Sequence, residues 1–71
     1  MNTDTYDWLT RLVEESLEHP LTSDWEKGFM ADQQTRLNDY ATNTLFSAKQ
    51  WAVVTRIANK IDFESPPDDF D

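Results

Sequence analysis

The chain has 71 residues, with 14 acidic and 6 basic side chains and a formal net charge of −8 at pH 7. This length predicts one domain, and the charge argues against a surface built for general nucleic-acid binding, because contacts with phosphate dominate such binding. The lack of cysteine excludes disulfides and thiolate metal sites. No apolar run reaches the roughly 18 residues of a membrane span, so we expect a soluble, cytoplasmic protein.

The first predicted helix covers residues 4–19. Thr3 or Asp4 is expected to cap it, and Pro20 ends it, because proline disfavours the α conformation of the preceding residue. His19, the one histidine, is expected to complement the helix dipole at the C-terminal end. The predicted apolar face consists of Tyr6, Leu9, Leu12, Val13, Ser16 and Leu17, with Trp8 at its border.

The opposite face of this helix is acidic and consists of Asp4, Asp7, Glu14 and Glu18. With a rise of about 1.5 Å per residue, these carboxylates lie about 6–10 Å apart, a spacing similar to that of a nucleic-acid backbone. Such a face could occupy a basic groove meant for DNA or RNA, and the alternative is an ordinary solvated helix face. Trp8 is expected to serve as an aromatic anchor at the rim of this surface.

The second predicted helix covers residues 23–42 and begins with a capping box formed by Ser23 and Glu26. Its expected apolar face consists of Trp25, Phe29, Met30, Gln33, Leu37, Tyr40 and Ala41. Asp32 and Asp39 share the opposite face and join the predicted partner-binding residues. Gly28 indicates either a close helix crossing or a position without a strict requirement.

The third predicted helix covers residues 47–61, with a Ser47–Gln50 capping box and a Phe46–Trp51 hydrophobic staple. Its expected core face consists of Gln50, Trp51, Val54, Ile57, Ala58 and Ile61. Its far side carries a basic band of Lys49, Arg56 and Lys60, in a segment without acids. Two interpretations remain open: the band contacts phosphate, or the acidic tail that follows folds over the band and neutralises it.

Residues 62–71 form an acidic tail with two prolines, expected to be extended and flexible unless something holds it. We predict a recognition segment that uses Phe63, Asp68, Asp69 and Phe70. The run Asp68-Asp69-Phe70 resembles the C-terminal tips of bacterial single-stranded-DNA-binding proteins, which recruit repair and replication enzymes. Those tips end on the phenylalanine, whereas Asp71 follows here.

A second resemblance covers residues 21–61. Leu21-Thr22, Asp24 to Phe29 (DWEKGF) and Phe46 to Gln50 (FSAKQ) resemble a two-helix pattern, L-[ST]-x-W-E-x-x-F followed by L-S-x-K-Q. Ser23 is an extra residue relative to this pattern, and Phe46 replaces its second leucine. This pattern occurs in small phage and bacterial proteins tied to DNA metabolism. The resemblance implies a shared helical fold and a phage or mobile-element origin, hence a place in the host cytoplasm. It implies no catalytic residue.

Together these features predict an all-α, three-helix bundle over residues 1–61, followed by the tail. We expect a non-enzymatic binding protein without cofactor or metal, which blocks the basic nucleic-acid-binding surface of a host defence or DNA-processing complex. That is the mode of DNA-mimic, anti-CRISPR or anti-restriction inhibitors. One alternative is a nucleic-acid accessory module that uses the basic band. Another is a homodimer or larger homo-oligomer, with Trp8, Met30 and Trp51 as apolar seam.

Overall fold

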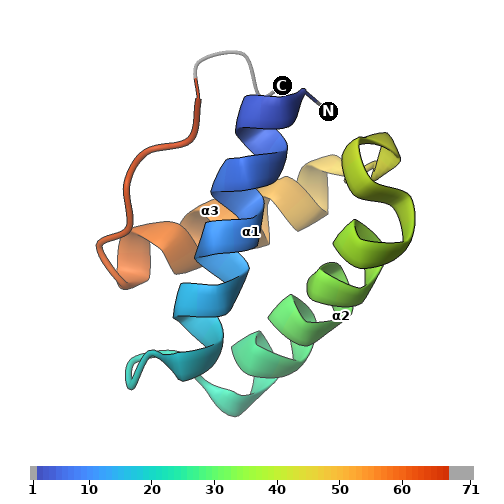
Figure 1. The fold of residues 1–71 in the computed structure, drawn as a ribbon. Helices are drawn as coiled ribbons and strands as arrows, with labels where there is room; N and C mark the ends of the chain where they lie inside the picture. The colour runs from blue at the N-terminus through green and yellow to red at the C-terminus, as the bar shows by residue number, and fades with distance from the viewer. Residues whose placement is uncertain (1, 68–71) are drawn as a thin grey trace.

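The computed structural model describes residues 2–67. Within this range the elements are α1 (Thr3–Glu18), α2 (Asp24–Tyr40), the short 3-10 helix η1 (Ala41–Asn43) and α3 (Ala48–Lys60). The described residues form no strand, so the predicted all-α class is confirmed, and each α-helix begins and ends within two residues of its expected range. Figure 1 shows α1 crossing in front of α3, with α2 running beside α1.

The N-termini of α2 and α3 follow the local sequence signals. Ser23 Oγ accepts from the Glu26 N–H at 3.2 Å, and Glu26 Oε1 accepts from the Ser23 N–H at 2.8 Å. Ser47 and Gln50 repeat this reciprocal arrangement at 3.2 and 2.7 Å. Both predicted capping boxes are therefore confirmed.

The N-terminus of α1 corrects the expected cap. Asn2, not Thr3 or Asp4, is the N-cap, because its backbone is extended and its Oδ1 accepts from the Thr5 N–H at 2.8 Å. Thr3 and Asp4 already belong to the first turn. The helix therefore starts one residue earlier than expected.

The core contains apolar side chains from all three helices and the residue after α3. Its buried members are Trp8, Leu9, Leu12, Val13, Met30, Leu37, Val54, Ile57, Ala58 and Ile61. Phe46 and Trp51 pack against this core, with ring centroids 5.1 Å apart, as expected for the staple. Trp8 is only 1% exposed and Met30 is fully buried, so two of the three residues expected at a homodimer seam are already inside the protomer.

Trp8 also corrects the expected rim anchor. The indole packs edge-on against the Phe63 ring, with centroids 6.1 Å apart, and its Nε1 donates to the Glu64 carbonyl oxygen at 3.0 Å. The core therefore holds both ends of this side chain, and Trp8 presents no surface to a partner. The buried face of α1 is rotated toward Trp8 and Thr5 relative to the expected one.

The buried face of α2 differs from the predicted face. Glu26, Met30, Gln33 and Leu37 are buried at i, i+4, i+7 and i+11, which places them on one side of the helix. Trp25 is 62% exposed and Tyr40 is 60% exposed, so neither belongs to the core. The two aromatic residues looked apolar in the sequence, but they lie away from the stripe that faces α1 and α3.

Gly28 lies on an exposed part of α2. A Cβ atom built at this glycine meets no atom within 4 Å, so a close helix crossing does not explain it.

At the end of α1, His19 is the C-cap, and its Nδ1 accepts from the Leu21 N–H at 3.1 Å. Its role is thus a local turn contact.

The first part of the tail turns back from the end of α3 and runs along the bundle (Figure 1), where side chains of α1 contact it. Phe63 packs on Trp8, the Phe63 N–H donates to the Ala58 carbonyl oxygen at 2.8 Å, and Glu64 forms an ion pair with Arg11. Phe63 therefore contributes to the core, and its expected part in recognition stays a prediction. The predicted recognition residues Asp68, Asp69 and Phe70 lie outside the described residues.

Candidate protein-binding surfaces

The acidic face of α1 stays exposed in the folded chain. It consists of Asp4, Asp7, Glu14, Glu15 and Glu18, all exposed. Glu15 was not in the predicted set, although its position eleven residues after Asp4, about three helical turns, would have indicated it. None of these five carboxylates forms an ion pair within residues 2–67.

Arg11 is the one basic residue of α1 and lies among these acids. Its guanidinium pairs with Glu64 of the tail, with both side chains more than half exposed. Glu64 of the tail therefore pairs with the positive charge that would otherwise offset the acidic face. An exposed ion pair of this kind contributes little stability, about 0–1 kcal/mol.

Asp32 and Asp39 are exposed as predicted, but they lie on α2, apart from the acidic face of α1. Asp32 lines a hollow between α2 and the start of α3, whereas Asp39 lines neither of the hollows described below. The predicted partner-binding residues therefore divide between two helices and do not form one continuous stripe.

The basic band of α3 is partly neutralised from within the bundle. Lys60 Nζ donates to Glu26 Oε1 at 2.8 Å, and Glu26 is only 6% exposed. The Lys60 ammonium, followed by the Ser23 N–H, lowers the pKa of the Glu26 carboxyl to about 2, against the opposing effect of burial. Lys60 is thus part of the structure that joins α2 to α3.

Lys49 and Arg56 are exposed, and neither forms an ion pair with another described residue. The described part of the tail does not cover them, because Glu64 pairs with Arg11. The interpretation that the tail neutralises the basic band is therefore wrong for residues 62–67. The remaining acidic residues of the tail lie outside the described residues.

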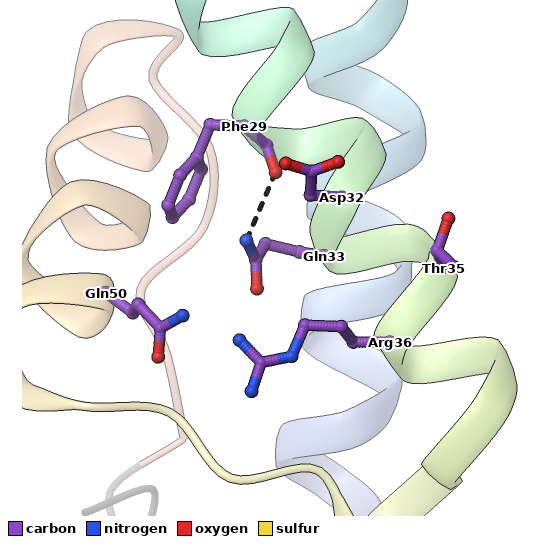
Figure 2. Close-up of a pocket in the computed structure, with 6 residues that line it drawn as sticks. All are labelled: Phe29, Asp32, Gln33, Thr35, Arg36 and Gln50. Carbon is purple, nitrogen blue, oxygen red and sulfur yellow. Dashed lines mark hydrogen bonds between the residues drawn. The ribbon is translucent and has the colours of Figure 1, made fainter.

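The first hollow of the molecule opens between α2 and the N-terminus of α3 and has a volume of about 560 Å³. Phe29, Asp32, Gln33, Thr35, Arg36 and Gln50 line it. Figure 2 shows the side chains of Gln33, Arg36 and Gln50 converging from the two helices. Arg36 is held in place because Nη2 donates to the Leu45 carbonyl oxygen at 3.1 Å and the guanidinium lies 5.9 Å from the Phe46 ring centroid.

Gln33 carries an unpaired acceptor in this hollow. Gln33 is only 4% exposed, and its Nε2 donates to the Phe29 carbonyl oxygen at 3.2 Å. Its Oε1 accepts no hydrogen bond from the described residues. In Figure 2 the oxygen points away from Phe29, into the space in front of Arg36 and Gln50. A buried acceptor without a partner costs about 1–3 kcal/mol, so a donor placed there is favourable.

A second hollow of about 430 Å³ continues along α2 toward its N-terminus. Asp24, Trp25, Gly28, Phe29 and Asp32 line it. The Trp25 and Phe29 rings stack with centroids 5.7 Å apart and planes inclined by 16°. Phe29 and Asp32 belong to both hollows, so the two adjoin along α2, and together they are called the α2 groove.

Residues 2–67 contain no group of three or more His, Asp or Glu side chains placed to hold a metal ion. In the same part of the chain, no helix combines the length and the apolar character needed to cross a membrane. Comparison of the chain with protein-family models, with curated proteins and with solved structures gives no match.

Proposed function

We propose that this chain is an acidic, protein-binding domain that covers a basic, nucleic-acid-binding surface of another protein. The observation that carries the proposal is the exposed acidic face of α1, with five carboxylates outside any ion pair of the described residues. Glu14 follows Asp7 by seven residues and Glu18 follows Glu14 by four. The carboxylates are therefore spaced about 6–10 Å apart along the helix, as charges are along a nucleic-acid backbone.

The free-energy cost of placing several carboxylates on one face of α1 supports a role beyond hydration. A solvated helix commonly intersperses acids with lysine or arginine four residues away, because such pairs stabilise the helix. Here Arg11 is the one base of α1, and its partner is Glu64 of the tail. The face therefore retains its mutual repulsion, which a basic partner would relieve.

The corresponding biological role is inhibition, because a protein that occupies a nucleic-acid-binding groove excludes DNA or RNA from it. This is the mode of a DNA-mimic inhibitor from a phage, acting in the host cytoplasm on a defence or DNA-processing complex. The phage origin is an expectation from the resemblance of residues 21–61 and is part of the proposal.

The test immobilises the chain, passes a bacterial lysate over it and elutes with a double-stranded DNA oligonucleotide. We expect retained proteins that bind nucleic acid and that DNA releases by competition. Glu14→Lys/Glu18→Lys should abolish this retention, because it places two positive charges on the acidic face. Circular dichroism should remain unchanged, since both residues are exposed.

The control is Asn38→Lys/Asp39→Lys, which also adds two lysines, at exposed positions of α2 outside both hollows, and changes the net charge by about +3 against about +4 for the α1 variant. This control should retain the captured proteins. Equal retention by the α1 variant and the wild type, or elution that does not depend on DNA, would contradict the proposal.

The alternative function, direct binding of nucleic acid by Lys49, Arg56 and Lys60, has less support. Lys60 donates to the buried Glu26 carboxylate, which leaves two bases of the band outside any ion pair of the described residues, on a chain of net charge −8. Affinity for single-stranded DNA at low ionic strength, lost in Lys49→Glu/Arg56→Glu, would favour the alternative.

A further inference from the structure

The groove along α2 carries features that the acidic face of α1 does not use. The α2 groove is defined here by Asp24, Trp25, Phe29, Asp32, Gln33 and Arg36. Trp25, Phe29, Asp32 and Arg36 are spaced i, i+4, i+7 and i+11, which places them on one side of the helix. At 1.5 Å per residue they span about 16 Å, the length of about five residues of extended chain.

The N-terminal half of the α2 groove favours a cation. The exposed Trp25 ring stacks on Phe29, which in turn packs against the core, so the pair forms a fixed aromatic platform. Asp24 and Asp32 line the same hollow. A guanidinium can stack on an aromatic face and donate to a carboxylate at the same time.

The middle of the groove offers a hydrogen-bond acceptor. Gln33 Oε1 has no partner among the described residues and is directed into the hollow (Figure 2), while the Nε2 contact with the Phe29 carbonyl oxygen fixes this orientation of the amide. A backbone N–H of an extended segment is a donor of the right kind for it.

The C-terminal end of the groove has the opposite charge. Arg36 is anchored by the Leu45 carbonyl oxygen and the Phe46 ring, and its side chain lines the hollow. A cationic side chain avoids this end, whereas a backbone carbonyl is attracted to it. The change of sign along α2 therefore determines which end of the groove takes the arginine of a bound segment.

We propose that the α2 groove binds an extended, arginine-bearing segment of the partner protein. The arginine lies on the Trp25–Phe29 platform between Asp24 and Asp32, and the adjacent backbone reaches Gln33 and Arg36. This inference rests on the proposed function for the basic character of the partner, but it places the contact on a different helix. Trp25 then becomes the aromatic anchor that we expected of Trp8.

The test is an NMR titration of the ¹⁵N-labelled chain with an acetylated, amidated Gly-Gly-Arg-Gly-Gly peptide at low ionic strength. The signals of the Trp25 indole, the Gln33 side-chain amide and the Asp32 backbone should shift. The buried Trp8 indole should not shift. The same peptide with citrulline in place of arginine keeps the shape but lacks the charge, and it should not shift these signals.

Two matched pairs of variants localise the binding. Trp25→Ala and Asp32→Asn should each weaken the peptide about three- to fivefold. Tyr40→Ala and Asp39→Asn remove an equally exposed aromatic ring and an equal charge from the same helix outside the groove. These controls should bind within about twofold of the wild type.

Equal weakening by Asp32→Asn and Asp39→Asn would mean diffuse charge attraction and would overturn the inference, as would the absence of shifts at Trp25. Glu14→Lys/Glu18→Lys separates this result from the proposed function. If the groove inference holds, that variant still shows the Trp25 shifts, even where it no longer captures nucleic-acid-binding proteins. If only the proposed function holds, capture depends on α1 and the peptide leaves Trp25 unchanged.

Discussion

At the scale of the residue, Glu26 is the described carboxylate that burial and hydrogen bonds affect most. Its Oε1 accepts from the Ser23 N–H and from Lys60 Nζ, each at 2.8 Å, so one oxygen both caps α2 and joins it to α3. The pKa of this carboxyl falls from 4.5 to about 2, chiefly because of Lys60. The ionised form is thus the one that the folded chain stabilises.

This arrangement predicts a specific dependence of stability on pH. A lowered pKa in the folded state contributes stability above the unfolded value, and that stability is lost as pH falls from about 4.5 to about 2. Glu26→Gln keeps an amide oxygen for the cap but removes the ion pair. We expect a lower free energy of unfolding than wild type at pH 7, and a difference that shrinks across this range, measured by urea denaturation.

The control for this prediction is Glu15→Gln, which neutralises an exposed carboxylate without an ion pair in the described chain. It should keep the wild-type loss of stability between pH 4.5 and pH 2. A constant difference between Glu26→Gln and wild type at all pH values would mean that the Glu26 carboxylate is not linked to folding in this way.

At the scale of the element, α2 contains a glycine at a position where the backbone conformation does not require one. Gly28 lies within the helix, has no positive φ and has open space where a Cβ would lie. Gly28→Ala should therefore stabilise the chain by about 0.5–1 kcal/mol, because alanine loses less backbone entropy in a helix. For a domain of this size the melting temperature should rise by roughly 4 °C.

The reciprocal variant is Ala31→Gly, at another exposed position of the same helix. It should lower the melting temperature by a similar amount. Because Gly28 also lines the second hollow, a stabilised Gly28→Ala that still binds the arginine peptide would show that the glycine serves neither folding nor binding. A lowered melting temperature for Gly28→Ala would contradict the open environment of this residue.

The same helix shows which parts of an element a sequence can predict. The caps at Ser23 and Ser47 were correct because each depends on a partner three residues away. The predicted buried face of α2 was correct for Met30, Gln33 and Leu37. It was wrong for Trp25 and Tyr40, which are exposed, and it missed Glu26, because these positions depend on neighbours far along the chain. Glu26 is buried through Lys60, 34 residues later, and no local periodicity reveals that pairing or the resulting exposure of Trp25.

The candidate site also has features that the local sequence predicts and features that depend on distant neighbours. The exposure of Asp7, Glu14 and Glu18 could be predicted, since a run of acids on one side of an amphipathic helix faces water. The groove could not, because it requires the relative placement of α2 and α3 and the orientation of one buried amide, Gln33. Sequence periodicity predicts neither the relative placement of the two helices nor the orientation of the amide.

At the scale of the whole molecule, the tail completes the core. Trp8 comes from the first helix, and it is enclosed only where Phe63 and the Glu64 carbonyl oxygen return to it, 56 residues later. The three helices alone would leave this indole with an exposed face and an unpaired N–H. A boundary of the folded unit at residue 61 would therefore cut through packed structure.

Two truncated chains test this dependence, one ending after Pro67 and the other after Asp62, so that they differ only in residues 63–67. The shorter chain loses the half-buried Phe63 ring and the acceptor of the Trp8 indole. We expect a free energy of unfolding lower by about 2–3 kcal/mol, from roughly 1–2 for the ring and about 1 for the unpaired donor. For a domain of this size, that corresponds to a melting temperature lower by roughly 10 °C or more.

The indole signal of Trp8 provides a local readout of the same change. Its N–H should exchange slowly with solvent in the chain ending at Pro67 and rapidly in the chain ending at Asp62, because its acceptor is the Glu64 carbonyl oxygen. Phe63→Ala in the longer chain should give an intermediate stability, since the acceptor remains while the ring is lost. Equal melting temperatures for the two truncated chains would mean that α1, α2 and α3 enclose Trp8 without the tail.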